Sequence, residues 1–222
     1  MSEDVSVGGH KRPSYIVGIG ASAGGLEALE AFFATIPEGL NAAFVVIQHL
    51  SPNFKSLMNQ LLAHHTEMEI KQVHTDMVLE ANTIYLIPPR KNLVLDRYRL
   101  ELVNQEKETG IELPINVFFH SLAQMFRKRA IGIILSGTGS DGSRGIQSIH
   151  SEGGLVMVQD SDSAKFDGMP RSAINTGIVD FVGDTEALAH RVTEYVQNNG
   201  QIEKVIMEDA PAEDQQALSM LF

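Results

Sequence analysis

Residues 15–36 read YIVGIGASAGGLEALEAFFATI, and this stretch decides the fold class of the chain. Its first six residues form a short apolar run that ends in glycines, as expected of a buried β-strand. From Leu26 onward, the apolar residues recur at helical spacing. The stretch therefore predicts a strand, a tight turn and a helix, which is the repeating unit of α/β proteins.

The same alternation continues along the chain. Apolar runs predict strands at 42–50 (AAFVVIQHL), 131–137 (IGIILSG), 155–160 (LVMVQD) and 178–182 (IVDFV). Helical spacing predicts helices at 54–63, 116–129, 144–152 and about 184–198. Between 69 and 103, short β-like pieces are broken by Asn, Pro and Asp, and 168–174 (GMPRSAI) is predicted to lie in a loop.

These patterns predict an α/β fold with a doubly wound, mostly parallel sheet, helices on both faces and a short antiparallel β hairpin region. The expected organisation is a disordered leader at 1–13, one domain at 14–200 and an acidic tail or linker at 201–222. The leader has no apolar core, and no run reaches the roughly 18 apolar residues that span a bilayer. We expect a soluble cytoplasmic protein without membrane insertion.

Charge and composition exclude several classes of function. The formal net charge is -11, with 28 acidic against 17 basic side chains, which disfavours binding to the phosphates of nucleic acid. The chain has no cysteine, so disulfides, thiol catalysis and thiolate metal sites are excluded. His64, His65 and His74 lie near one another but lack HExxH spacing, and no metal site is predicted.

Two interpretations compete for the glycine-rich loop at 18–25, GIGASAGG. Glycines after a first strand either let a dinucleotide pyrophosphate approach the backbone or form the strained turn that exposes a serine nucleophile. The glycine spacing departs from GxGxxG by one residue, and the second strand lacks a ribose-binding acid at its end. Gly20-x-Ser22-x-Gly24 instead predicts a nucleophile at Ser22, although by position alone Ser22 is equally a cap for the following helix.

The remaining catalytic residues are sought at strand ends, because parallel α/β sheets bind ligands at the carboxyl ends of their strands. A serine nucleophile needs an imidazole to accept its proton and a carboxylate to orient that imidazole. His49 follows the second predicted strand, and Asp141 follows the strand at 131–137. Ser22, His49 and Asp141 are therefore predicted to converge across one crevice, although Asp141 alone could equally cap the helix after it.

Four motifs together, VGIGASAGGLEAL, VVIQHL, LSGTGSDG and FDGMPRSAI, resemble the catalytic domain of the CheB protein-glutamate methylesterases of bacterial chemotaxis. The resemblance covers roughly residues 14–200. The family's serine, histidine and aspartate fall on Ser22, His49 and Asp141. Its fold, a doubly wound and mostly parallel sheet, agrees with the alternation described above.

The resemblance implies hydrolysis of glutamyl methyl esters on the cytoplasmic helices of chemoreceptors, with release of methanol and deamidation of receptor glutamines as a second activity. The family pattern places the oxyanion donors at the backbone N–H groups of Ala23 and Thr138, where many members carry Thr and Met. No cofactor is implied. The opening and the acidic tail also resemble multidomain proteins in which this esterase precedes a CheR-type methyltransferase, so such a domain is a candidate partner.

Two other classes of function remain as alternatives. A scaffold would keep the fold and dock receptors or a methyltransferase domain without turnover. A nucleotide-binding protein would use the glycine-rich loop for phosphates.

Overall fold

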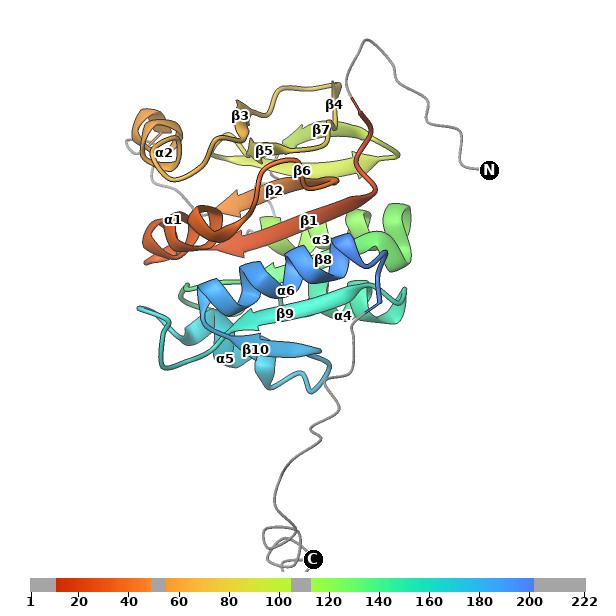
Figure 1. Cartoon of the computed structure of the whole chain (residues 1–222). Coiled ribbons are helices and arrows are strands. Elements are labelled where there is room, and N and C mark those ends of the chain that lie inside the picture. Colours follow the sequence, from red (N-terminus) through yellow and green to blue (C-terminus); the bar gives the residue numbers. More distant parts are fainter. Residues whose placement is uncertain (1–10, 49–54, 105–112, 202–222) are drawn as a thin grey trace, which may run out of the picture.

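Strands and helices alternate along most of the chain in this computed structural model, which describes residues 11–48, 55–104 and 113–201 (Figure 1). The expected tail beyond residue 201 and most of the expected leader lie outside these ranges. The elements are β1 (Tyr15–Ala21), α1 (Gly25–Thr35), β2 (Ala42–Gln48), α2 (Lys55–Leu62), β3 (Glu69–Gln72), β4 (Met77–Val78), β5 (Thr83–Leu86), β6 (Lys91–Asp96), β7 (Arg99–Asn104), α3 (Pro114–Phe126), the 3-10 turn η2 (Arg127–Arg129), β8 (Ala130–Ile134), α4 (Ser143–Ser151), β9 (Leu155–Gln159), α5 (Gly168–Ile174), β10 (Phe181–Gly183) and α6 (Thr185–Gln197). No helix within the described ranges is long and apolar enough to cross a bilayer.

Seven parallel strands form the main sheet in the order β10-β9-β8-β1-β2-β5-β3. The chain first builds outward from β1 through β2 and later returns to place β8 on the other side of β1. Doubly wound proteins bind their ligands at the carboxyl ends of the strands where the strand order reverses, which here is the carboxyl end of β1. The predicted fold class is confirmed.

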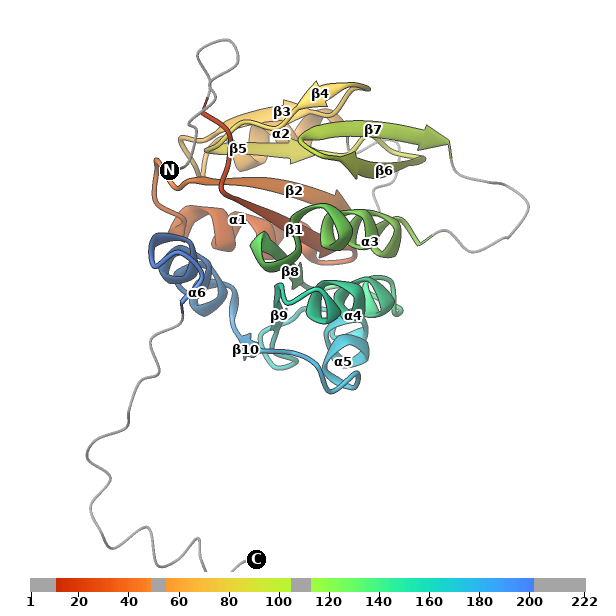
Figure 2. The same ribbon diagram turned by 90° about the vertical axis from the view of Figure 1, so that its right-hand side faces the viewer.

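Helices cover both faces of this sheet (Figure 2). One core lies under α1 and α6 and the other under α3, α4 and α5. Every residue of β1, β2, β8 and β9 is buried, which explains why these strands appear in the sequence as continuous apolar runs. The strand ends that matter for function therefore project from a rigid, doubly covered sheet.

The region from 69 to 103 differs in part from the expected hairpins. β4, β7 and β6 form a small antiparallel sheet, as predicted. β3 and β5, however, join the main sheet as parallel strands. β5 is fully buried between β2 and β3, and because both pairings are parallel they need crossover connections and not hairpin turns.

Gly18 and Gly20 belong to β1 rather than to the loop after it. A Cβ on Gly18 would lie 2.8 Å from Phe119 Cε1, and a Cβ on Gly20 would lie 2.6 Å from Ile115 Cγ2. Both glycines thus let α3 pack directly on the strand. Side chains of α3 occupy the space beside both glycines and leave no room for a pyrophosphate. Gly18 and Gly20 therefore do not support the nucleotide-binding alternative.

Residues 168–174 form the helix α5, so the prediction of a loop there is wrong. Pro170 lies in the first turn, where N–H groups have no acceptor within the helix and proline costs little. Met169 and Ala173 are buried against the α3 face of the sheet. The short length of the helix and its internal proline hid this apolar side from sequence analysis.

Candidate active site

Ser22 is the first residue beyond β1 and contacts the loop that follows β8. Its backbone N–H donates to the Ser136 carbonyl at 3.0 Å. A Cβ added to Gly137 would lie 3.0 Å from Ser22 Cβ, so only glycine lets the two segments approach this closely. Gly24, and not Ser22, is the N-cap residue of α1. The alternative of Ser22 as a helix cap is therefore wrong.

The turn from β1 into α1 is less strained than expected. Ser22 does not adopt a positive φ, whereas Gly24 has φ 70° in the left-handed region. Glycine reaches that region without steric cost, so the sharp part of the turn falls two residues after the serine. The prediction of a strained serine is wrong, because Gly24 makes the bend instead.

The Ala23 N–H group is held in a fixed direction beside Ser22. The Ser22 carbonyl oxygen accepts the Gly25 N–H at 2.9 Å and the Gln48 side-chain amide at 3.4 Å. Because a trans peptide places its N–H opposite its C=O, the Ala23 N–H points away from these two donors. It donates to no other group within the described residues.

The Thr138 N–H group is fixed in the same way. The Gly137 carbonyl oxygen accepts the Met169 N–H at the start of α5 at 2.8 Å, which directs the Thr138 N–H to the opposite side. In the part of the chain that the structure describes, this N–H also donates to no group. Two N–H groups that donate no hydrogen bond within the described residues therefore flank the contact between Ser22 and Gly137.

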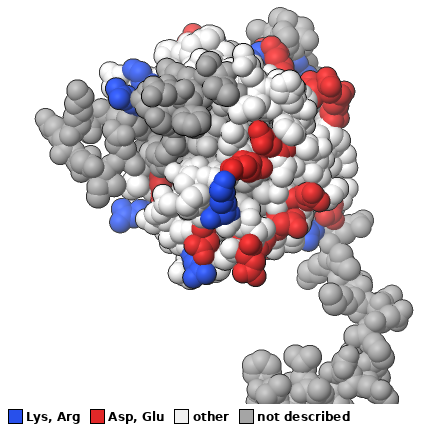
Figure 3. Space-filling view, turned by 90° about the vertical axis from the view of Figure 1, so that its left-hand side faces the viewer, with Lys and Arg blue, Asp and Glu red and all other residues white. Residues whose placement is uncertain are grey.

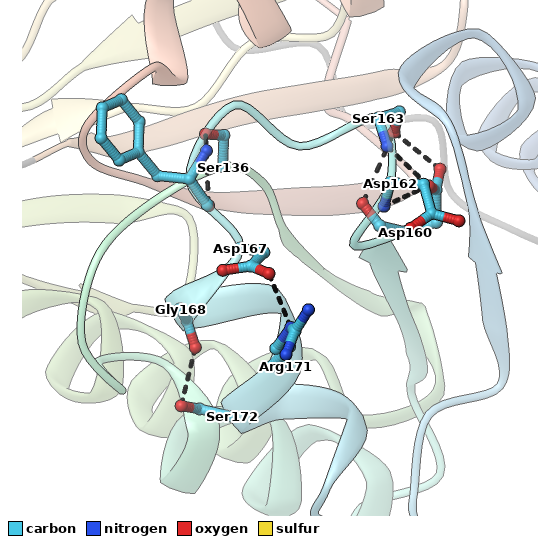
Figure 4. A network of polar contacts seen from close by, with 9 residues as sticks. Ser136, Asp160, Asp162, Ser163, Asp167, Gly168, Arg171 and Ser172 are labelled. Atoms are coloured by element: carbon cyan, nitrogen blue, oxygen red, sulfur yellow. Dashed lines mark hydrogen bonds and ion pairs between the residues drawn. The ribbon is translucent and has the colours of Figure 1, made fainter.

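Ser136 ties these segments together, and sequence analysis did not identify it. Its hydroxyl donates to the Ala23 carbonyl at 2.9 Å and accepts the Phe166 N–H at 3.0 Å. Its own N–H donates to Gln159 Oε1 at 2.9 Å. Only 1% of Ser136 is exposed. Buried polar groups satisfied on every side fix local geometry firmly. Figure 4 shows Ser136 beside the polar contacts around Asp160 and Asp167.

Asp141 follows β8 in a buried position with only 4% of its surface exposed. Its carboxylate accepts the N–H groups of Ile115 and Asn116, each at 3.0 Å, and of Gly142 at 2.8 Å. Ile115 and Asn116 lie in the first turn of α3, so Asp141 caps a helix that precedes it in the sequence. The helix after it, α4, has Gly142 and not Asp141 as its N-cap residue, so the predicted alternative is wrong.

His49 lies outside the described residues. Its neighbour Gln48 is the last residue of β2 and pairs with Ala21, which directly precedes Ser22. The Gln48 side chain is buried, and its Oε1 has no hydrogen-bond partner among the residues that the structure describes. Of the three predicted catalytic residues, the structure describes Ser22 and Asp141, which follow the adjacent strands β1 and β8 at their carboxyl ends, as predicted.

Acidic side chains spread over much of the face at which these strands end, with fewer basic ones between them (Figure 3). Burial alone would raise the pKa of Asp160, but hydrogen bonds from Ser163 and Asp162 outweigh it and hold that pKa below its ordinary value. A hydrogen bond from Lys165 likewise lowers the pKa of Glu27. Both carboxylates are therefore charged at neutral pH.

Comparison with known proteins gives a family for this site. The family model described as CheB methylesterase matches residues 17–192. The chain belongs to the CheB methylesterase family. The crystal structure of the Thermotoga maritima CheB methylesterase catalytic domain is 25% identical, superimposes with a TM-score of 0.75, and is matched over 97% of its length and 81% of this chain.

Relatives of this CheB methylesterase domain differ in length. A putative protein-glutamate methylesterase/protein-glutamine glutaminase of Leptospira interrogans is 30% identical, with 82% of this chain and 94% of the relative covered. A protein-glutamate methylesterase/protein-glutamine glutaminase of Rhizobium meliloti is 32% identical, with 82% and 52% covered. An uncharacterized 104.1 kDa protein of Rhodobacter capsulatus is 42% identical, with 63% and 14% covered. The chain thus spans about half of one relative and a small part of another.

Proposed function

We propose that this chain hydrolyses glutamyl methyl esters on the cytoplasmic helices of chemoreceptors and releases methanol. The observation that carries this proposal is the position of Ser22 at a strand end, beside the N–H groups of Ala23 and Thr138, which donate no hydrogen bond within the described residues. This arrangement occurs in a member of the CheB methylesterase family. Receptor glutamines are proposed as second substrates, because their amide differs from the ester only in the leaving group.

In the proposed reaction, Ser22 Oγ attacks the ester carbonyl carbon while His49 takes its proton. The bond to the methoxide oxygen then breaks, and His49 returns the proton so that methanol leaves. A glutamyl ester of Ser22 remains. Water next gives a proton to His49 and attacks this ester, which frees the glutamate and restores the Ser22 hydroxyl.

The oxyanion that forms in each step is stabilised by the Ala23 and Thr138 N–H groups. Such donors accelerate the reaction when they are already aimed at the developing charge. Hydrogen bonds on the far side of both peptide groups, at the Ser22 and Gly137 carbonyls, support this role because they prevent rotation. Replacement of the family's common Thr and Met by Ala23 and Thr138 leaves backbone donors intact.

Asp141 is proposed to orient His49 and to stabilise its charged form. Three backbone N–H groups hold the Asp141 carboxylate in one orientation. A carboxylate fixed in this way can present an oxygen to an imidazole without losing further conformational entropy. This support comes from α3 and from the loop itself, and therefore does not depend on the substrate.

The proposed partners follow from the reaction. A methyl ester must be made before it can be hydrolysed, so a CheR-type methyltransferase is the enzyme expected beside this domain, in the cytoplasm where receptor helices are methylated. The length of the Rhodobacter capsulatus relative, of which the match covers 14%, is compatible with domains joined in one polypeptide.

The test is methanol release from methylated receptor fragments. Ser22→Ala and His49→Ala should each lower turnover on the order of 10³-fold or more, and the double variant should be little worse because the triad acts as a unit. Ser151→Ala, which removes an exposed hydroxyl on α4, is the matched control and should retain full turnover. A fluorophosphonate probe should label Ser22; a wild-type chain that binds receptors but neither reacts with the probe nor releases methanol would instead be a scaffold.

A further inference from the structure

One aromatic side chain remains exposed beside the proposed nucleophile. Phe166 keeps 41% of its surface accessible and is the aromatic member of the five large apolar residues that are exposed in the described chain. Its Cδ2 lies 3.0 Å from the point that a Cβ on Gly24 would occupy, two residues after Ser22. The ring therefore borders the turn that carries the serine.

The backbone of Phe166 is fixed on both sides. Its N–H donates to Ser136 Oγ at 3.0 Å, and its carbonyl oxygen accepts the Gly137 N–H at 2.9 Å. These are the residues that also position the proposed oxyanion donors. These bonds fix the backbone that carries the ring beside the proposed site.

The charges next to Phe166 are neutralised by partners. Lys165 pairs with Glu27 on α1 at 2.5 Å, and Asp167 pairs with Arg171 on α5 at 2.6 Å. Figure 4 shows the second pair, which lies between the Ser136 network and Ser172. The ring is thus an apolar contact between two neutralised pairs, on a face that is otherwise rich in acidic side chains.

We infer that Phe166 is the contact by which this site selects a protein ester over a small one. This inference rests on the proposed function. A methyl ester offers little surface of its own, so recognition needs neighbouring side chains of the substrate helix. Residues three and four positions away lie on the same helix face as the esterified glutamate. The Phe166 ring packs against an apolar side chain at one of these positions, as aromatic anchors do in protein interfaces.

The experiment compares two esters in the full chain, a methylated receptor fragment and p-nitrophenyl acetate. For Phe166→Ala, the ratio of kcat/KM for the receptor fragment to that for the small ester should fall about tenfold or more, mainly through a higher KM for the fragment. Phe166→Leu keeps an apolar surface and should lose less. Met125→Ala is the matched control, since Met125 is 40% exposed at the end of α3 opposite to the one that Asp141 caps, and it should leave the ratio unchanged.

Two results would overturn the inference. An equal loss for both esters would show that the ring shapes the reaction centre and does not dock the protein. An unaltered ratio in Phe166→Ala would show that the substrate does not touch the ring. Neither result would affect the proposed esterase, which fails if the wild-type chain releases no methanol from the methylated receptor fragment.

Discussion

At the scale of single residues, Ser136 has more influence on the geometry around Ser22 than its place in the sequence suggests. Ser136→Ala removes the hydroxyl that joins the Ala23 carbonyl to the Phe166 N–H and leaves both groups without this partner. Because the oxyanion donors lose their alignment while the binding surface remains, kcat for p-nitrophenyl acetate should fall about tenfold to a hundredfold with little change in KM. Steady-state kinetics on the purified variant measure kcat and KM separately.

Ser151→Ala again serves as the control, because its hydroxyl bonds only within α4. A Ser136→Ala variant whose KM rises while its kcat stays constant would show that Ser136 shapes substrate binding and does not align the donors.

Gln48 offers a second prediction at this scale. Its amide nitrogen holds the Ser22 carbonyl, while its Oε1 is buried and has no partner within the described ranges. Gln48→Met keeps the shape and removes both polar atoms. Since an unpaired buried oxygen costs about 1–3 kcal/mol, the free energy of unfolding should stay constant or rise. The Ala23 N–H loses one support at the same time, so kcat should fall.

Urea denaturation and ester kinetics on the same Gln48→Met preparation separate these two effects. A variant that is both clearly less stable and fully active would contradict the proposed role of Gln48 in aligning the Ala23 N–H. The Gln48 amide would then only stabilise the fold.

At the scale of elements, the starts of α3 and α4 cap each other. Asp141, just before α4, accepts N–H groups from the first turn of α3, and Asn116 of α3 accepts the Gly145 N–H of α4 at 2.7 Å. Loss of a cap costs about 1 kcal/mol. Asn116→Ala should therefore lower the free energy of unfolding by about this amount and leave most of the turnover intact.

Asp141→Asn should lower both the free energy of unfolding and the turnover. One carboxylate oxygen becomes an amide that faces backbone donors, which costs about 1–3 kcal/mol of stability. Turnover should fall on the order of 10³-fold, because His49 loses its anionic partner. Chemical denaturation and methanol release on both variants test this, and equal turnover in Asp141→Asn and Asn116→Ala would remove Asp141 from the proposed triad.

The same elements show what sequence analysis could and could not supply. Buried parallel strands appear as apolar runs, so the positions of Ser22 and Asp141 at strand ends followed from the sequence pattern alone. The reciprocal caps could not be found, because Asp141 bonds with residues 25 and 26 positions earlier and no local pattern records such a distance. α5 was missed because proline suggests a loop unless its place in the first turn is known.

At the scale of the whole molecule, distant parts of the chain meet around two tyrosines. Tyr15 on β1 and Tyr195 on α6 pack edge to face with ring centroids 5.6 Å apart, and the Tyr195 hydroxyl donates to the Lys128 carbonyl at 3.4 Å. This contact joins β1, the turn before β8 and α6. It therefore holds α6 over the face of the sheet that also carries α1.

These tyrosines should make the folded state sensitive to alkaline pH. Burial raises the pKa of both Tyr15 and Tyr195 above the ordinary value of 10.0, and for Tyr195 the nearby Tyr15 and Asp180 raise it further. A group whose pKa is raised in the folded state stabilises that state fully below its unfolded pKa and loses this effect as pH rises through the folded pKa. The free energy of unfolding should thus fall as pH rises above about 10. Because phenylalanine cannot ionise, Tyr195→Phe should fall less steeply than wild type in urea titrations at pH 8 and 11, whereas parallel curves would show that Tyr195 remains solvated in the folded chain.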